Sequence, residues 1–149
     1  MITLKRTNSD DADFQNLVRN LDKELAVRDG EEHAYYAQFN KIDALKYVVL
    51  AYENETAVGC GAIKEFAENA MEVKRMFVPE DKRGKGIASL VLNELEKWAT
   101  ELDNKKCVLE TGYKQPEAIA LYKKNGYTQI PNYGQYIGMD NSVCFEKVL

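Results

Sequence analysis

The segment 78–88, VPEDKRGKGIA, places two glycines and three cations where a predicted strand gives way to a predicted helix. Gly84 and Gly86 permit positive φ angles and let a ligand approach the backbone closely. The first N–H groups of the following helix lack partners within it, and the helix dipole is positive there. A turn of this kind binds a phosphate or a diphosphate. The three cations are expected to add mobile positive charge: Lys82, Arg83 and Lys85.

Two other phosphate-binding loops fit this segment less well. A P-loop requires Gly-Lys followed by Ser or Thr, whereas Lys85 is followed by Gly86. A dinucleotide fingerprint requires a third glycine where Ser89 stands. Short glycine motifs are weak evidence alone, so an ordinary strand-to-helix turn with a solvated basic face stays an alternative.

Histidine and cysteine usage argues against several other kinds of site. The chain has one histidine, His33, which gives little support to a His-based metal site or a His–Cys dyad, so no metal is expected. Its three cysteines, Cys60, Cys107 and Cys144, are odd in number, far apart and embedded in apolar segments. This pattern predicts reduced core thiols of a cytoplasmic protein, with a catalytic cysteine as an open alternative.

Length and composition predict one globular domain over residues 1–149. The chain is 45% hydrophobic and 30% charged, with a formal net charge of −4. That balance argues against general affinity for nucleic acids or anionic membranes. The apolar stretches are too short to span a bilayer, and residues 1–6 lack the apolar core of a secretory signal.

Hydrophobic periodicity predicts a mixed α/β fold. Strands are expected over 2–7, 47–52, 56–64, 70–78, 107–111, 127–131 and 142–149, and helices over 11–30, 31–40, 86–102 and 116–126. The order is β-α-α-β-β-β-α-β-α-β-β, in which a three-strand antiparallel meander is followed by crossover helices. Within the meander, Gly59 and Gly61 predict a bend or a close backbone approach.

This order of elements and two motifs resemble the GNAT superfamily of acetyl-CoA-dependent N-acetyltransferases over nearly the whole chain. The family loop Q/R-x-x-G-x-G/A is matched by 81–86, DKRGKG, in which Asp81 replaces the usual Gln or Arg. This departure affects one side-chain contact but leaves the backbone cradle intact. The family ending A-x-x-L-Y-x-x-x-G-F/Y is matched within 117–127, EAIALYKKNGY, and Gln115 stands where an asparagine is common.

The resemblance implies acetyl transfer from acetyl-CoA to a primary amine of a small molecule or amino acid by direct attack. It implies that the strand before the loop splays from the next strand, and that the pantetheine arm inserts between them. The arm would contact Met76, Phe77, Val78 and Gln115, and the Met76 N–H would donate to the oxyanion. The diphosphate would be held by Arg83, Gly84, Lys85, Gly86, Ile87 and Ala88.

By the same resemblance, Tyr122 is the candidate general acid near the cofactor sulfur. A phenol with an ordinary pKa of about 10 can protonate a thiolate whose conjugate acid has a pKa near 8.5 to 9. Glu72 is the candidate base, because strand alternation puts it on the same face as Lys74 and Met76. A core tyrosine, an exposed strand glutamate and a water chain are the alternatives, and Glu110 is a second candidate base.

The acceptor pocket is expected to be lined by residues 28–39 and 131–139. The candidate contacts are Arg28, His33, Tyr36, Tyr133 and Tyr136. Acidic residues of the first segment could attract a cationic acceptor, whereas Arg28 or His33 could hold a carboxylate. Solvated helix ends and a structural turn are the alternatives. Two other functions stay open, a protein lysine or N-terminal acetyltransferase and a non-catalytic acyl-CoA sensor. A homodimer is a further expectation, because dimers are common in the superfamily.

Overall fold

The structure, a computed structural model, describes residues 1–29 and 44–149, with the side chains of Arg28 and Asp29 left out. The predicted helix at 31–40 lies outside the described residues. The candidate acceptor contacts His33 and Tyr36 lie there too.

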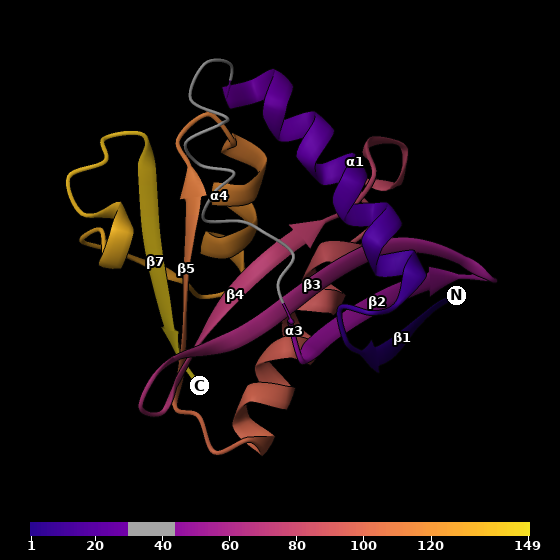
Figure 1. Cartoon of the computed structure of the whole chain (residues 1–149), viewed down its shortest axis with the longest axis horizontal. Helices are drawn as coiled ribbons and strands as arrows, with labels where there is room; N and C mark the ends of the chain where they lie inside the picture. The colour runs from indigo at the N-terminus through magenta and orange to yellow at the C-terminus, as the bar shows by residue number, and fades with distance from the viewer. Residues whose placement is uncertain (30–43) are drawn as a thin grey trace.

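Within the described residues, a mixed sheet of seven strands forms the centre of the molecule (Figure 1). Its strands are β1 (Ile2–Thr7), β2 (Tyr47–Glu53), β3 (Thr56–Ala67), β4 (Ala70–Phe77), β5 (Lys106–Gly112), β6 (Thr128–Ile130) and β7 (Ser142–Val148). Their order is β1-β2-β3-β4-β5-β7-β6, and the neighbours pair antiparallel except β4 and β5, which pair parallel. The predicted strands and the antiparallel meander are therefore confirmed.

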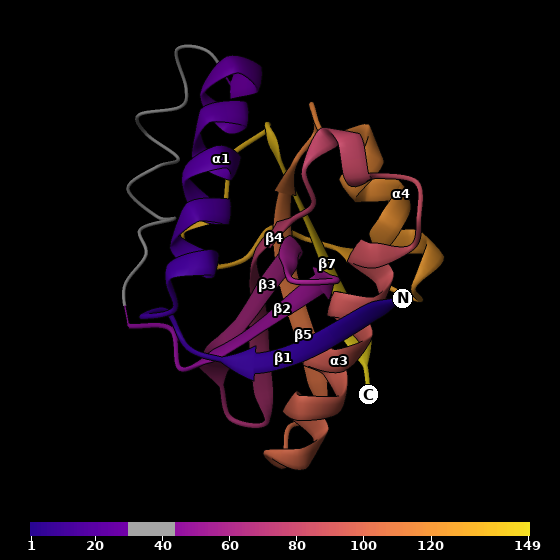
Figure 2. The same ribbon diagram turned by 90° about the vertical axis from the view of Figure 1, so that its right-hand side faces the viewer.

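Helices cover both faces of the sheet (Figure 2). The first, α1 (Ala12–Asp29), begins after Asp11, whose carboxylate accepts the backbone N–H of Asp13 at 2.9 Å. Its apolar stripe, which includes Phe14, Leu17 and Val18, packs on one face. The stripes of α3 (Ile87–Glu101) and α4 (Pro116–Lys124) pack on the opposite face, around Val91, Leu95 and Tyr122. No helix among the described residues is long and apolar enough to cross a membrane.

A β-bulge interrupts β4. Cys60 of β3 pairs with Phe77, and Ala62 pairs with Lys74, so two residues of β4 oppose the single residue Gly61. One of these two, Arg75, has a φ of +58°, in the left-handed region.

The bulge changes which residues of β4 share a face. Lys74 pairs with Ala62, which belongs to the core beneath α1, whereas Met76 packs against the core beneath α3. The prediction that Glu72, Lys74 and Met76 share a face is therefore wrong, because strict alternation holds only in an unbroken strand. Gly61 makes room for this arrangement, since a Cβ atom there would collide with the Met76 thioether. The predicted close approach at this glycine is confirmed.

The parallel pair β4–β5 is short. Pairing is confined to Ala70–Glu72 on β4 and Lys106–Val108 on β5. Beyond Glu72 the two strands separate, and the gap between them opens toward α1 on one side and α4 on the other (Figures 1 and 2). The sheet is thus split along the second half of β4, the part that leads into the glycine-containing loop.

Candidate active site

Two adjoining cavities occupy the region where β4 and β5 separate. The larger, which we call the cradle cavity, measures about 490 Å³ and is lined by the end of β4, the loop at 82–86, the start of α3 and one side of α4. The smaller, which we call the splay cavity, measures about 110 Å³ and lies between β4, β5 and α1. The two have lining residues in common: Leu21, Met76, Gln115, Ala118 and Tyr122.

The glycine loop forms one wall of the cradle cavity. Gly84 and Gly86 both have a φ of +80°, and a Cβ atom on either would meet no atom within 4 Å. Gly86 is the N-cap of α3, and its carbonyl accepts the N–H of Leu90 at 3.1 Å. The next two residues, Ile87 and Ala88, line the cavity and carry N–H groups of the first helical turn. This open backbone at the positive end of a helix fits a diphosphate.

The cations of the loop are more restrained than expected. The Nε of Arg83 donates to the carbonyl of Val78 at 2.8 Å, and its Nη2 contacts both carboxylate oxygens of Glu24, at 2.7 and 2.8 Å. Lys82 pairs with Glu53 at 3.0 Å. Both residues are thus paired with acidic side chains in the structure. Lys85 is exposed and is not one of the described residues that line the cavity.

Glu24 is a residue of the cavity wall that sequence analysis missed. It lies on α1 and lines the cradle cavity together with Arg83. Nothing in the helical pattern of α1 marks it, because its role depends on where α1 docks. An acid therefore stands beside a site suited to an anion.

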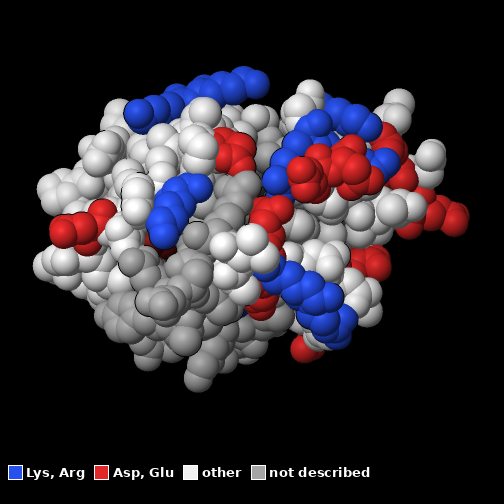
Figure 3. Space-filling model, turned by 90° about the horizontal axis from the view of Figure 1, so that it is seen from above, with Lys and Arg blue, Asp and Glu red and all other residues white. Residues whose placement is uncertain are grey.

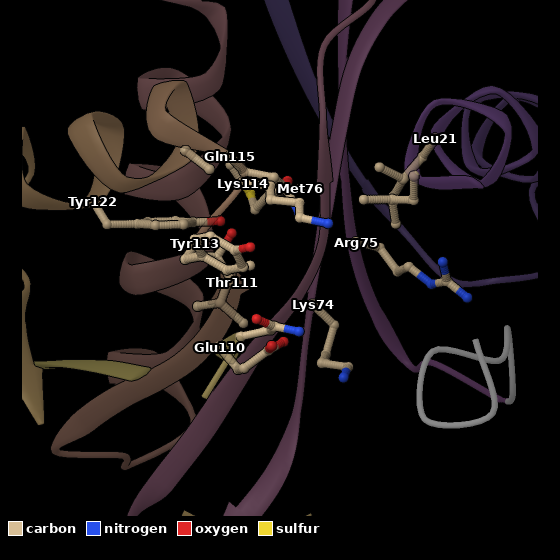
Figure 4. Close-up of a pocket in the computed structure, with 15 residues that line it drawn as sticks. Leu21, Lys74, Arg75, Met76, Glu110, Thr111, Tyr113, Lys114, Gln115 and Tyr122 are labelled. Carbon is tan, nitrogen blue, oxygen red and sulfur yellow. The ribbon is translucent and has the colours of Figure 1, made fainter. Parts of the chain in front are cut away.

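Tyr122 lies where the two cavities meet. Its side chain projects from α4 toward the cavity (Figure 4), and its ring packs at 5.8 Å from Tyr127 and 6.2 Å from Phe145. Burial, with a smaller effect of the Glu110 carboxylate, raises the pKa of Tyr122 well above its ordinary value. Tyr122 is therefore a neutral hydrogen-bond donor at physiological pH.

The two candidate bases occupy different places. Glu110 lines the splay cavity, and its carboxylate accepts the Ser142 hydroxyl at 2.8 Å. Glu72 is 4% exposed and accepts the Tyr133 hydroxyl at 2.6 Å. Among the described residues that line the two cavities, Glu110 is present and Glu72 is not. The structure thus brings Glu110, rather than Glu72, to the same cavity as Tyr122.

The segment before β7 lies against the sheet. The ring of Tyr133 packs at 4.8 Å from Phe66 and 5.8 Å from Tyr136, which is fully buried. Neither tyrosine is one of the described residues that line the cavities, whereas Asn141 does line the splay cavity. Arg28, the other candidate acceptor contact on a described element, lies in the last turn of α1.

The cofactor contacts predicted on β4 lie along the cradle cavity. Met76, Phe77 and Val78 all line it. The thiol of Cys60 donates to the carbonyl oxygen of Arg75, with an Sγ–O distance of 3.4 Å. In a trans peptide the C=O and N–H groups point in opposite directions. The N–H of Met76, in the same peptide group as this carbonyl, therefore points away from the Cys60 thiol.

Arg75 is the second residue that sequence analysis missed. Its side chain is 4% exposed, lines the splay cavity and pairs with Asp22 of α1 at 2.8 Å. A left-handed arginine has no sequence signal, since Gly, Asn and Asp are the residues that favour such a backbone.

The cysteines and the possible metal ligands do not form a second reactive site among the described residues. Cys60, Cys107 and Cys144 are buried, and burial raises the pKa of Cys60 and of Cys107 to about 12, so neither is a thiolate at neutral pH. In the part of the chain that the structure describes, no group of three or more His, Cys, Asp or Glu side chains could hold a metal ion.

Comparison with known proteins identifies the family. Residues 15–127 match the Acetyltransferase (GNAT) family. An IAA acetyltransferase of Azospirillum brasilense is 38% identical over 102 residues, which cover 68% of this chain and 67% of the relative. The crystal structure of the "putative acyl-CoA N-acyltransferase" from Klebsiella pneumoniae superposes with a TM-score of 0.83 at 30% identity, covering 100% of this chain and 98% of the other.

A more distant structure shares the fold. PaiA N-acetyltransferase of Thermoplasma acidophilum, solved in complex with coenzyme A, superposes with a TM-score of 0.74 at 17% identity and covers 100% of this chain and 99% of its own. The overall fold is thus shared with these two structures. The chain belongs to the GNAT acetyltransferase family and is an acyltransferase.

Proposed function

We propose that this protein transfers an acetyl group from acetyl-CoA to the primary amine of a small molecule. The observation that carries this proposal is that the cradle cavity adjoins the splay cavity at Tyr122. The cradle cavity suits a nucleotide-linked diphosphate, and the splay cavity has room for a small molecule. The coenzyme A bound to the Thermoplasma relative supports the same co-substrate here.

The residues of the cradle cavity fit coenzyme A. Gly84, Gly86, Ile87 and Ala88 offer open backbone to the diphosphate. The remaining wall is mainly apolar and is formed partly by Met76, Phe77 and Val78 and by Ala118, Ala120 and Leu121 of α4. Such a wall suits the pantetheine arm, and Gln115 adds an amide for hydrogen bonding.

Three groups around the junction of the cavities supply the chemistry that amine acetylation needs. Glu110 accepts the proton of the attacking amine, directly or through water. The N–H of Met76 donates to the thioester oxygen as it becomes negative, a contribution of about 3 kcal/mol for one such donor. Tyr122 protonates the departing thiolate. Burial raises the pKa of this phenol, and it raises that of a thiol held in the same cavity in the same sense.

Glu72 has a different role in this arrangement. Its carboxylate lies outside the cavity lining and is occupied by the Tyr133 hydroxyl at 2.6 Å. We assign it to fixing the segment before β7, which also carries the lining residue Asn141.

Substitution of the loop glycine tests the co-substrate. Gly86→Ala adds a methyl group to the diphosphate cradle, and we expect the Kd for coenzyme A in calorimetry to rise at least about tenfold. Gly138→Ala is the matched control, because Gly138 has a φ of +81°, equally open space and a position away from the cavity. An equal loss of binding in both variants, or no binding by the wild type, would contradict the proposal.

An assay of coenzyme A release with a panel of acceptors tests the reaction. Turnover with small primary amines, and not with lysine peptides, is the expected result. Turnover confined to peptides would favour a protein acetyltransferase. Binding of coenzyme A without turnover of any acceptor would favour the acyl-CoA sensor.

A further inference from the structure

We propose that the acceptor amine also carries a carboxylate, which Arg75 and Lys74 bind in the splay cavity, so that the substrate is a small amino acid. This inference rests on the proposed function, and it concerns the opposite side of the junction from the coenzyme A site. It depends on two cations of β4, one carboxylate of β5 and the size of the cavity between them.

Arg75 has hydrogen-bonding capacity to spare within a buried environment. Its side chain is 4% exposed, and its Nη1 donates to Asp22 at 2.8 Å. Its Nε is buried and has no hydrogen-bond partner among the described residues. Buried polar groups are nearly always paired, and an unpaired one needs a specific physical reason. This nitrogen is enclosed, so a ligand would contact the guanidinium through its other nitrogen atoms. A guanidinium in a cavity wall is suited to a planar carboxylate.

Lys74 adds a second cation to the same wall. It lies next to Arg75 on β4 and also lines the splay cavity. Its pKa is lowered by burial, while the carboxylates of Glu72 and Glu110 act in the opposite direction. The β4 side of the cavity thus combines two basic side chains (Figure 4).

The opposite wall has the opposite charge. Glu110 lies across the cavity on β5 (Figure 4). The Ser142 hydroxyl donates to its carboxylate at 2.8 Å. An amine directed to Glu110 and a carboxylate directed to Arg75 match the two walls of the cavity. A small amino acid carries both groups, whereas a simple amine would match the wall of β5 alone.

The bulge and the cavity size point to a short acceptor. Arg75 precedes Met76, whose N–H we assign to the thioester oxygen, so the carboxylate and the reacting carbonyl would be bound by neighbouring residues. Strained residues such as a left-handed arginine cluster at functional sites, and bulges re-aim side chains there. A cavity of about 110 Å³ has room for a small molecule.

A comparison of matched acceptors tests the inference. We would measure kcat/KM for several α-amino acids and, for each, its amide and the amine that lacks the carboxyl group. We expect the amino acids to be preferred on the order of 10- to 100-fold, because neither analogue has the negative charge that forms an ion pair with the guanidinium. Equal kcat/KM values for the three classes would overturn the inference and leave the proposed function standing.

Substitutions of Arg75 distinguish a role in binding the acceptor carboxylate from a role in the fold alone. Arg75→Gln should raise KM for amino acids and leave that for the uncharged amines nearly unchanged, and Arg75→Lys should restore part of the preference. Lys106→Gln is the control, because Lys106 is a strand cation paired with Glu146 at 3.4 Å outside the cavity. If Arg75→Gln lowered kcat/KM equally for all acceptors, Arg75 would have only a structural role and the inference would fail.

Equilibrium binding decides the question even if no acceptor turns over. With coenzyme A present, calorimetry should show tighter binding of an N-acetylated amino acid than of its amide, and Arg75→Gln should remove the difference. No turnover together with this preference would reject the proposed function and support the carboxylate site. No preference would reject the carboxylate site.

Discussion

At the scale of single residues, the surroundings of Tyr122 decide what its hydroxyl can do. Its ring is held between α4 and the core by Tyr127 and Phe145, and its hydroxyl is at the junction of two cavities. Burial keeps the phenol neutral. A neutral donor held in one orientation is what protonation of a leaving thiolate requires.

Tyr122→Phe removes this hydroxyl and keeps the ring. We expect kcat to fall about 10²- to 10³-fold, within the usual range for loss of a general acid, with little change in KM for acetyl-CoA. Tyr127→Phe is the control, because its ring packs against Tyr122 outside the cavity lining. Steady-state kinetics check both variants, and an unchanged kcat for Tyr122→Phe would remove Tyr122 from the mechanism.

At the same scale, some features were predictable and others were not. Gly61 could be predicted as a close approach, because a glycine inside an otherwise apolar strand often marks a bend or a tightly packed neighbour. Gly84 and Gly86 could be predicted as an anion cradle from their position between strand and helix. The left-handed Arg75 could not, since its conformation arises from the pairing of β4 with β3.

At the scale of elements, the periodicity of apolar residues was sufficient to predict the sheet and three helices. Tyr47–Glu53 and Thr56–Ala67 alternate or run apolar between turns, and Ile87–Glu101 has a continuous stripe. Contacts between distant elements were beyond this reasoning. The pair Arg83–Glu24 joins residues 59 positions apart and depends on how α1 docks.

This contact between α1 and the loop leads to a prediction about coenzyme A affinity. Glu24→Gln removes a negative charge from the cradle cavity and leaves Arg83 bound to the carbonyl of Val78. We expect the Kd for coenzyme A to fall about two- to tenfold, because Arg83 then meets the diphosphate without a competing acid. Calorimetry at low and high salt measures the Kd for coenzyme A in the wild type and in Glu24→Gln.

The opposite result would also be informative. If Glu24→Gln weakened coenzyme A binding, the carboxylate would act by orienting Arg83 rather than by competing with the ligand. Asp22→Asn is the matched control, because it removes an acid of α1 that pairs with Arg75 and does not line the cradle cavity.

At the scale of the whole molecule, mixed charges link segments that lie far apart in the sequence. Figure 3 shows Lys and Arg side chains beside Asp and Glu side chains on one face. Arg6 of β1 contacts Glu101 of α3 at 2.7 and 2.9 Å, and Lys82 contacts Glu53 of β2 at 3.0 Å. These contacts hold the first strand and the glycine loop against the rest of the domain.

Such contacts should make folding stability depend on pH in the acid range. The hydrogen bond from Arg6 lowers the pKa of Glu101, and that from Lys82 lowers the pKa of Glu53, from an ordinary value of 4.5. A carboxyl group with a lowered folded-state pKa contributes stability above its unfolded-state pKa, and the contribution disappears as the pH falls through the folded-state value. The free energy of unfolding should therefore decrease as the pH falls below about 4.5.

Urea unfolding from about pH 6 to about pH 3 measures this loss in the wild type and in Glu53→Gln/Glu101→Gln. The double variant should be less stable near pH 6 and should lose less stability on acidification, because its amides cannot take up the protons that the two carboxylates bind on unfolding. Glu55→Gln, in the exposed turn between β2 and β3, should follow the wild-type curve. Parallel curves for the wild type and the double variant would mean that other carboxylates control the acid transition, and that the β1–α3 contact contributes nothing measurable to the fold.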